Sequence, residues 1–479
     1  MKKNALHTLM ANSVSLLIKL MLAATATGFV FSFVPKKLSQ LQTPPVKYFI
    51  DSKNGSDRNS GTQKKLPWKT LARLSRTRLQ PGDSVFFKRG SSFNGPLIIT
   101  NSGTSDRYIV LTDYGSKKDL APVFTNSIFA ENNFGNCIRI EGSYVVVQNL
   151  FFTATSAYQP IRYAGDGWAV WEMGAIHIAR GAQHCIVRNN EFKDCVAGIR
   201  SNGEYALIEH NYIHDCNRVL SEWNWGPLGI WLGADHQEIR YNKIINISAV
   251  DPRIGWGPDS YGSGADGGAM EVDDARFSKS DISIHHNYTR DCQGFLEVTW
   301  TDVKQKPDYK NFRIHHNVSD DYQQFVAIWW GAGFHIENNT IVRRKVNANE
   351  WGVFNITQPN ANNFIRNNIV VTENEIVVFN VGRKGNAKPK NIISNNLYFA
   401  AAGKLNIGKE GPGDFARFEN PLFKNYKRAT TAYDFDILGK SAAVEGGMSV
   451  GYDKDFSGRK IPIGIAPDIG AFEYQGQIK

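Results

Sequence analysis

The chain carries a recurring alternation of apolar and polar positions that closes each time on an asparagine. The unit is apolar-x-apolar-x-x-Asn, as in CIVRNNEF around Asn190 and ISIHHNYT around Asn287. The asparagines of this pattern are Asn149, Asn190, Asn211, Asn242, Asn287, Asn317, Asn339, Asn368 and Asn396. Most intervals between them are 21 to 31 residues, and the two longer ones, 41 and 45 residues, contain insertions. Alternation with period 2 is typical of strands, and so small a unit buries its apolar face only by stacking on copies of itself.

A second strand precedes each of these asparagines, and its outward positions can be aligned from coil to coil. The inward column reads Ile138, Ile176, Ile199, Ile230, Met270, Leu296, Ile328, Phe354 and Phe379. The outward column one residue later reads Arg139, His177, Arg200, Trp231, Glu271, Glu297, Trp329, Asn355 and Asn380. Two residues further on lie Asn202, Asp273 and Thr299. Stacked strands are ~4.8 Å apart, so we expect Glu271 and Glu297 to be neighbours and Asp273 to share their face.

The fold can be named from this repeat together with the two ends of the chain. Asparagine tolerates the left-handed backbone of a sharp turn, and its amide can bond to the asparagine of the next coil. This ladder, the entry segment YFIDSKNGSDRNSG…PWKTL…PGDSVFFKRG and the closing PDIGAFEY resemble the pectate-lyase-like superfamily of exported parallel β-helix proteins, over about residues 46–475. The resemblance implies an all-β fold, a single right-handed parallel β-helix of about nine or more coils with an N-terminal cap and long loops on one face. Its expected parts are a cap with the first coils at 46–134, ladder coils at 135–400, and C-terminal coils with a cap at 401–475.

The amino terminus predicts export. Lysines at positions 2, 3 and 19 precede an apolar run at 20–34, which suits the core of a signal peptide, or a retained signal anchor, over residues 1–37. The formal charge of +10 includes five lysines in this segment, so the body carries 10 − 5 = +5. This small positive charge mildly favours anionic partners and does not indicate a nucleic-acid-binding surface. Of the five cysteines, Cys195, Cys216 and Cys292 each follow a ladder asparagine by five residues and are expected in the core, with a Cys195–Cys216 disulfide as the alternative.

The acidic residues on neighbouring coils are the candidate functional groups. Stacked like charges repel, so a pair such as Glu271 and Glu297 destabilises the sheet unless a cation, a shared proton or an arginine compensates it. A surface ladder neutralised by Arg200 or a loop lysine is the alternative to a functional site. Four insertions (153–173, 217–227, 247–267 and 300–309) are expected to border this face, and nine of the eleven tryptophans fall between residues 168 and 330. Exposed aromatic faces pack against sugar rings.

The first hypothesis is a polysaccharide lyase that cleaves a uronate polymer by β-elimination. Glu271, Asp273 and Glu297 would hold Ca²⁺ through oxygen ligands. The column also supplies His177 and Arg200 as acid, base or anion-binding groups. Similarity to the calcium-assisted alginate lyase and chondroitinase members of the superfamily implies this mechanism, although the column contains no lysine base and no ligand asparagine on the preceding coil. The expected substrate-binding residues are Trp231, Trp329, Arg139, Asn202 and Asn355.

Two other hypotheses use the same face. A retaining glycoside hydrolase needs two carboxyl groups ~5–5.5 Å apart, which Glu271 and Glu297 on neighbouring coils would supply. A non-catalytic glycan-binding protein of the cell envelope would use the acids to hold a structural ion. All three predict a monomer that binds a polysaccharide, without an organic cofactor.

Overall fold

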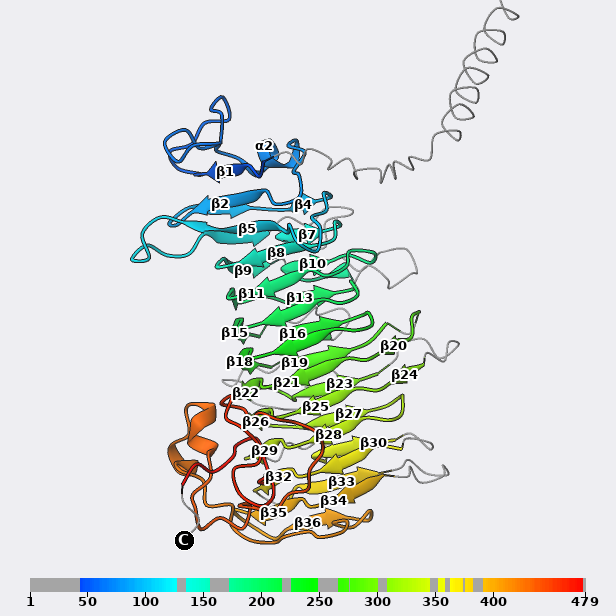
Figure 1. Ribbon diagram of the computed structural model, residues 1–479. Coiled ribbons are helices and arrows are strands. Elements are labelled where there is room, and N and C mark those ends of the chain that lie inside the picture. Colours follow the sequence, from blue (N-terminus) through cyan, green and yellow to red (C-terminus); the bar gives the residue numbers. More distant parts are fainter. Residues whose placement is uncertain are drawn as a thin grey trace, which may run out of the picture. The chain divides into compact units, whose positions relative to one another are not determined.

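The computed structural model describes residues 44–126, 135–155, 172–217, 225–248, 266–274, 276–299, 308–344, 352–357, 362–373, 375–381 and 391–476, and residues 45–479 form one compact unit. Its strands wind into three long parallel sheets stacked along one axis (Figure 1), and every pairing between neighbouring named strands is parallel. Each coil visits the first, second and third sheet in turn. The predicted parallel β-helix is confirmed.

The strands of each sheet follow the chain order. The first sheet contains β1 (Lys47–Ile50), β2 (Ser84–Lys88), β5 (Ile109–Tyr114), β8 (Val145–Gln148), β11 (Ile186–Arg188), β14 (Leu207–Glu209), β17 (Glu238–Arg240), β21 (Ser283–His285), β25 (Arg313–His315), β28 (His335–Glu337), β31 (Phe364–Arg366) and β34 (Ile392–Ser394). The second contains β3 (Ser92–Asn94), β6 (Val123–Asn126), β9 (Phe151–Thr155), β12 (Glu191–Lys193), β15 (Tyr212–Cys216), β18 (Lys243–Ile247), β22 (Tyr288–Arg290), β26 (Val318–Asp321), β29 (Thr340–Arg343), β32 (Ile369–Thr372) and β35 (Leu397–Ala400). The third contains β4 (Leu97–Ile99), β7 (Ile138–Ile140), β10 (Ile176–Ile178), β13 (Ala197–Ser201), β16 (Trp225–Leu232), β19 (Asp266–Val272), β23 (Leu296–Val298), β27 (Val326–Ile328), β30 (Phe354–Ile356), β33 (Val377–Val381) and β36 (Asn406–Gly408). A separate pair is formed by β20 (Lys279–Ser280) and β24 (Tyr309–Lys310).

The asparagine ladder lies at the turn from the first to the second sheet. From Asn190 to Asn396, the side-chain Nδ2 of each asparagine donates to Oδ1 of the next at 2.9 to 3.2 Å. The expected left-handed backbone falls on the residue before each ladder asparagine, as at Tyr241 with φ 53°. Asn149 is therefore assigned wrongly: it occupies this left-handed position, with φ 62°, and Leu150 stands in line with Asn190.

The interior is filled by stacked apolar side chains in register. Phe124, Phe152 and Phe192 follow one another on consecutive coils with ring centroids 5.5 and 4.9 Å apart. All five cysteines are buried and free. The core positions expected for Cys195, Cys216 and Cys292 are confirmed, and Cys195 and Cys216 form no disulfide. A short helix, α2 (Leu71–Ser75), begins at the N-cap residue Thr70 and buries two leucines at the amino-terminal end.

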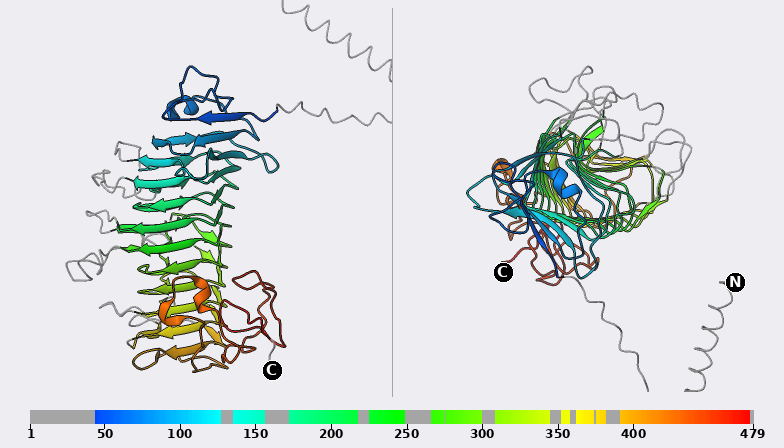
Figure 2. Two further views of the ribbon diagram at one scale, coloured as in Figure 1. Left: turned by 90° about the vertical axis from the view of Figure 1, so that its left-hand side faces the viewer. Right: turned by 90° about the horizontal axis from the view of Figure 1, so that it is seen from above.

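The prediction for residues 401–475 is C-terminal coils followed by a cap. One strand, β36, extends the third sheet, and Asp414 and Arg417 add a partial coil through bridges to the strands before them. The chain then passes through η4 (Tyr426–Arg428) and η5 (Ala432–Phe435) and packs Phe423, Phe435 and Phe472 against the outer side of the second sheet. This C-terminal segment is drawn in orange and red beside the coils in Figure 2.

Candidate active site

The outward column of the third sheet brings the predicted charged residues together. The Cα partners run Arg139, His177, Arg200, Trp231, Glu271 and Glu297, one residue per coil. Glu297 is next paired with Ala327, and Ala327 with Asn355. The position assigned to Trp329 is therefore wrong, because Val326 and not Ile328 stands opposite Leu296. Trp329 follows β27 two residues after Ala327, in the column that contains Asp273.

The middle of this column is buried although it points away from the helix interior. Arg200 and Trp231 each have 0% of their surface exposed, and the Arg200 guanidinium carbon lies 3.8 Å from the centre of the Trp231 ring. A guanidinium over an indole face is a favourable cation–π contact, and it grows stronger where water is excluded. Trp231 is thus a supporting wall for Arg200, and the expectation that it is an exposed sugar subsite is wrong.

The carboxyl groups differ in their exposure. Glu271 and Asp273 are both 2% exposed, whereas Glu297 is partly exposed and its Oε1 accepts a hydrogen bond from Trp329 Nε1 at 2.7 Å. Burial raises the pKa of Asp273 to about 6, against the lowering effects of its backbone hydrogen bond and of Arg200. Its Oδ1 has no hydrogen-bond partner within the described part of the chain. Asp273 is therefore protonated in mildly acidic solution and can act as a proton donor.

Asp274, which the sequence patterns did not single out, has the opposite electrostatic surroundings. Arg276 holds both of its carboxylate oxygens at 2.6 Å, and Arg180 and Arg200 approach Oδ2 at 3.4 and 3.7 Å. Although burial alone would raise the pKa of Asp274, these arginines hold it below its ordinary value. Neighbouring carboxyl groups with pKa values pushed apart are a common arrangement in acid–base sites.

A buried lysine behind these acids was also missed. The Nζ of Lys279, on β20, donates to the carbonyl oxygens of Asp274 and Phe277 at 2.7 and 2.8 Å and to the Tyr309 hydroxyl at 3.2 Å. Burial lowers its pKa to about 7, partly opposed by Asp274. This ammonium group fixes the loop that leads away from Asp273.

At the other end of the column, His177 is buried and held by ionic neighbours. Its Nδ1 lies 3.2 Å from Arg139 Nη1, and its Nε2 lies 3.3 Å from the Glu172 carboxylate. Burial first, and then Arg139, lower its pKa well below the ordinary value, so the imidazole is neutral. Neutral His177 can donate or accept a hydrogen bond but supplies no charge.

Two of the predicted substrate-binding asparagines have partners within the fold. Asn202 Nδ2 lies 3.1 Å from His177 Nε2, and Asn355 bonds through its side chain to both backbone groups of Gly352. On the coil between Asn202 and Asp273 stands Gly233, where a Cβ atom would meet Asn202 Oδ1 at 2.1 Å and Arg200 Nη2 at 2.9 Å. Glycine at this position leaves room for the buried guanidinium.

The described residues of this site do not form a ready-made metal-binding cluster. In the described ranges, no group of three or more His, Cys, Asp or Glu side chains is arranged to hold a metal ion. The predicted ligands Glu271, Asp273 and Glu297 share one face, but calcium binding to them stays a prediction.

Comparison with known proteins agrees with this architecture. The family model described as "Right handed beta helix region" matches residues 170–341. A solved structure, the complex of XylC with xylose, matches 90% of this chain and 98% of that chain, with a TM-score of 0.52 at 13% identity. These matches agree with a right-handed parallel β-helix as the fold of the chain.

One curated protein matches the chain by sequence. It is a lacto-N-biosidase from Bifidobacterium longum, 24% identical over 299 residues, or 52% of this chain. The chain spans 18% of the length of that relative. A solved lacto-N-biosidase from Eubacterium ramulus covers 78% of this chain and 68% of its own, with a TM-score of 0.42 at 14% identity.

Several predictions concern residues that the structure does not describe. The expected signal segment at 1–37 and most of the four insertions, with five of the tryptophans counted above (Trp168, Trp171, Trp223, Trp256 and Trp300), lie outside the described residues. Among the residues that are described, no helix is long and apolar enough to cross a membrane.

Proposed function

We propose that the protein is a glycoside hydrolase that cleaves a glycan between the carboxyl groups of Glu271 and Glu297. The observation that carries the proposal is that these two residues are Cα partners on neighbouring coils. Strands ~4.8 Å apart can place two carboxyl groups at the ~5–5.5 Å separation used for hydrolysis with retention of configuration.

The surroundings suggest a division of roles. Glu297 is partly exposed and receives the Trp329 Nε1 hydrogen bond, which favours its charged form, so it is the proposed nucleophile. Glu271, on the preceding coil, would protonate the leaving oxygen and then deprotonate the water that releases the product. Asp273 lies two residues from Glu271, and its pKa of about 6 makes it a local proton store. Arg200, stacked on Trp231, would offset part of the negative charge.

Similarity to the lacto-N-biosidase supports hydrolysis over elimination. This reverses the order that the sequence patterns favoured. The proposal includes a glycan partner, an exported location and a monomer, and it excludes nucleic acid as a partner.

A uronate lyase is the second candidate, and Lys279 is the observation that favours it. A lysine with a pKa of about 7 can serve as a base, and the lyase hypothesis lacked one. Its ammonium group is fully buried and donates to the carbonyl oxygens of Asp274 and Phe277 and to the Tyr309 hydroxyl, so these contacts would have to break before it could act on substrate.

The test is to incubate the protein with neutral and uronate-containing glycans, with and without a chelator. The hydrolase proposal expects new reducing ends, no unsaturated product and no effect of the chelator. Unsaturated uronate that disappears with the chelator would support the lyase instead. Binding without turnover would contradict both enzymes and favour a glycan-binding protein.

A further inference from the structure

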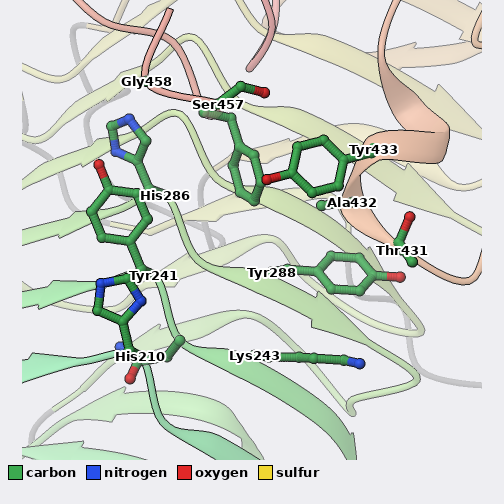
Figure 3. A pocket seen from close by; sticks show the side chains of 12 residues that line it. His210, Tyr241, Lys243, His286, Tyr288, Thr431, Ala432, Tyr433, Ser457 and Gly458 are labelled. Atoms are coloured by element: carbon green, nitrogen blue, oxygen red, sulfur yellow. The ribbon is translucent and has the colours of Figure 1, made fainter. Parts of the chain in front are cut away.

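A pocket lies at the turn between the first and second sheets, away from the acidic residues of the third sheet. It has a volume of about 460 Å³ and is enclosed by two parts of the chain that are distant in sequence, the coils around β17, β18, β21 and β22 and the C-terminal segment (Figure 3). Pockets of ~300–1,000 Å³ are typical of small-molecule sites. The acidic cluster does not contribute to it.

One wall is a column of aromatic rings. His210, Tyr241 and His286 occupy the left-handed position before successive ladder asparagines, with φ of 54°, 53° and 57°. The rings of His210 and Tyr241 stack at 5.0 Å, and those of Tyr241 and His286 lie 4.9 Å apart. Because the backbone repeats at this turn, the rings form one continuous wall along the pocket (Figure 3).

The C-terminal segment lines the opposite side of the pocket. Phe456 and Tyr433 meet edge to face at 5.9 Å, and Tyr433 is 58% exposed. The segment is fixed to the wall because His286 Nε2 donates to the carbonyl oxygen of Asp455 at 2.9 Å. An exposed tyrosine held by a rigid neighbour presents both an apolar ring and a hydroxyl group.

The floor adds a positive charge, because Lys243 lines the pocket with its Nζ 5.0 Å from the centre of the Tyr212 ring. Lys243 and Tyr288 are Cα partners on β18 and β22, and the two side chains extend side by side (Figure 3). The lining residues are His210, Tyr241, Asn242, Lys243, His286, Tyr288, Thr431, Ala432, Tyr433, Phe456, Ser457 and Gly458. Among these described residues there is no aspartate or glutamate. The exposed Lys243 is therefore free of a competing carboxylate in the lining and complements an anionic ligand.

We propose that this pocket is a second glycan-binding site that takes an acidic pyranose unit. Aromatic rings suit the apolar face of a sugar, the hydroxyl groups of Tyr241, Tyr433 and Ser457 suit its polar edge, and Lys243 suits a ring carboxylate. Such a site would hold the polysaccharide on the protein away from the site of cleavage. The inference does not depend on the proposed hydrolysis, because it concerns binding alone.

The experiment is calorimetric titration of the full chain carrying Glu271→Gln and Glu297→Gln, so that turnover does not consume the probe. The probes are a β-1,4-linked mannuronate tetramer and the matching mannose tetramer, which differs by lacking the carboxylates. Tyr433→Ala and Lys243→Gln are compared with Tyr205→Ala, an exposed tyrosine at the turn between the third and first sheets. Thermal melting checks that each variant folds.

The expected result is a binding phase for the mannuronate tetramer that Tyr433→Ala weakens at least tenfold and Lys243→Gln several-fold, while Tyr205→Ala leaves it unchanged. The mannose tetramer should bind more weakly and be insensitive to Lys243→Gln. Binding that is equal in all variants, or no binding of either tetramer, would overturn the site. Equal affinity for the two tetramers would overturn the assignment to an acidic sugar. Because the readout is affinity, these failures are separate from a failure to find hydrolysis.

Discussion

Replacing Asp273 by asparagine should stabilise the protein, by an amount that depends on pH. Burial raises the pKa of Asp273 from 3.8 to about 6, so the folded protein binds this proton more tightly than the unfolded chain does. The stability linked to this proton is complete below pH 3.8 and is lost as the pH rises through about 6. Two units of pKa correspond to about 3 kcal/mol.

Asparagine has the shape of the protonated acid but cannot ionise. We therefore expect Asp273→Asn to raise the free energy of unfolding by about 3 kcal/mol at pH 8 and by only about 0.5 kcal/mol at pH 4. Urea denaturation followed at both pH values measures the difference. Asp274→Asn is the matched control with the opposite sign, because Arg276 stabilises the charged form of Asp274 and the variant should lose stability at pH 8.

An equal effect of Asp273→Asn at the two pH values would show that Asp273 does not titrate abnormally. A loss of stability at pH 8 would be more informative still, since it would mean that the folded protein compensates the carboxylate, as a bound cation would.

Three further changes test the site and the fold. Trp231→Ala should cost about 3–5 kcal/mol in urea denaturation, because it removes a fully buried ring under Arg200; a cost below about 1 kcal/mol would restore the exposed-subsite hypothesis. Trp329→Phe removes the donor to Glu297 and should lower kcat/KM by about tenfold to a hundredfold with little change in Tm, and unchanged kinetics would contradict the role given to this bond. Asn287→Leu breaks the ladder in both directions and should lower Tm more than a leucine placed at an exposed turn would, whereas an unchanged Tm would show that the ladder contributes nothing to stability.

The period-2 alternation predicted the pairing of Glu271 with Glu297 because the flanking apolar residues fix which face is buried. The same rule failed at Trp329, since Val326 and Ile328 both point inward and a shift of two residues keeps every side chain on its face. The slip at Asn149 has a related cause, because Leu150 occupies its ladder position without an amide to reveal it.

Alternation also gives the direction of a side chain but not what covers it. Trp231 and Arg200 point outward and are nevertheless buried, which no local pattern reports. Lys279 reaches Asp274 and Tyr309 from a segment without a repeat, so its position depends on tertiary packing that a pattern of single residues does not contain.

The central claim is that Glu271 and Glu297 act together as the catalytic pair. The most direct measurement is the release of reducing ends from a hydrolysed glycan by the parent protein, the two single Gln variants and the double variant, with the anomeric configuration of the first product followed by NMR. The account predicts retention of configuration, loss of about 10³-fold or more in turnover at either glutamate, and no further loss in the double variant, because the two residues act as a unit. Undiminished turnover in the double variant Glu271→Gln, Glu297→Gln would contradict it.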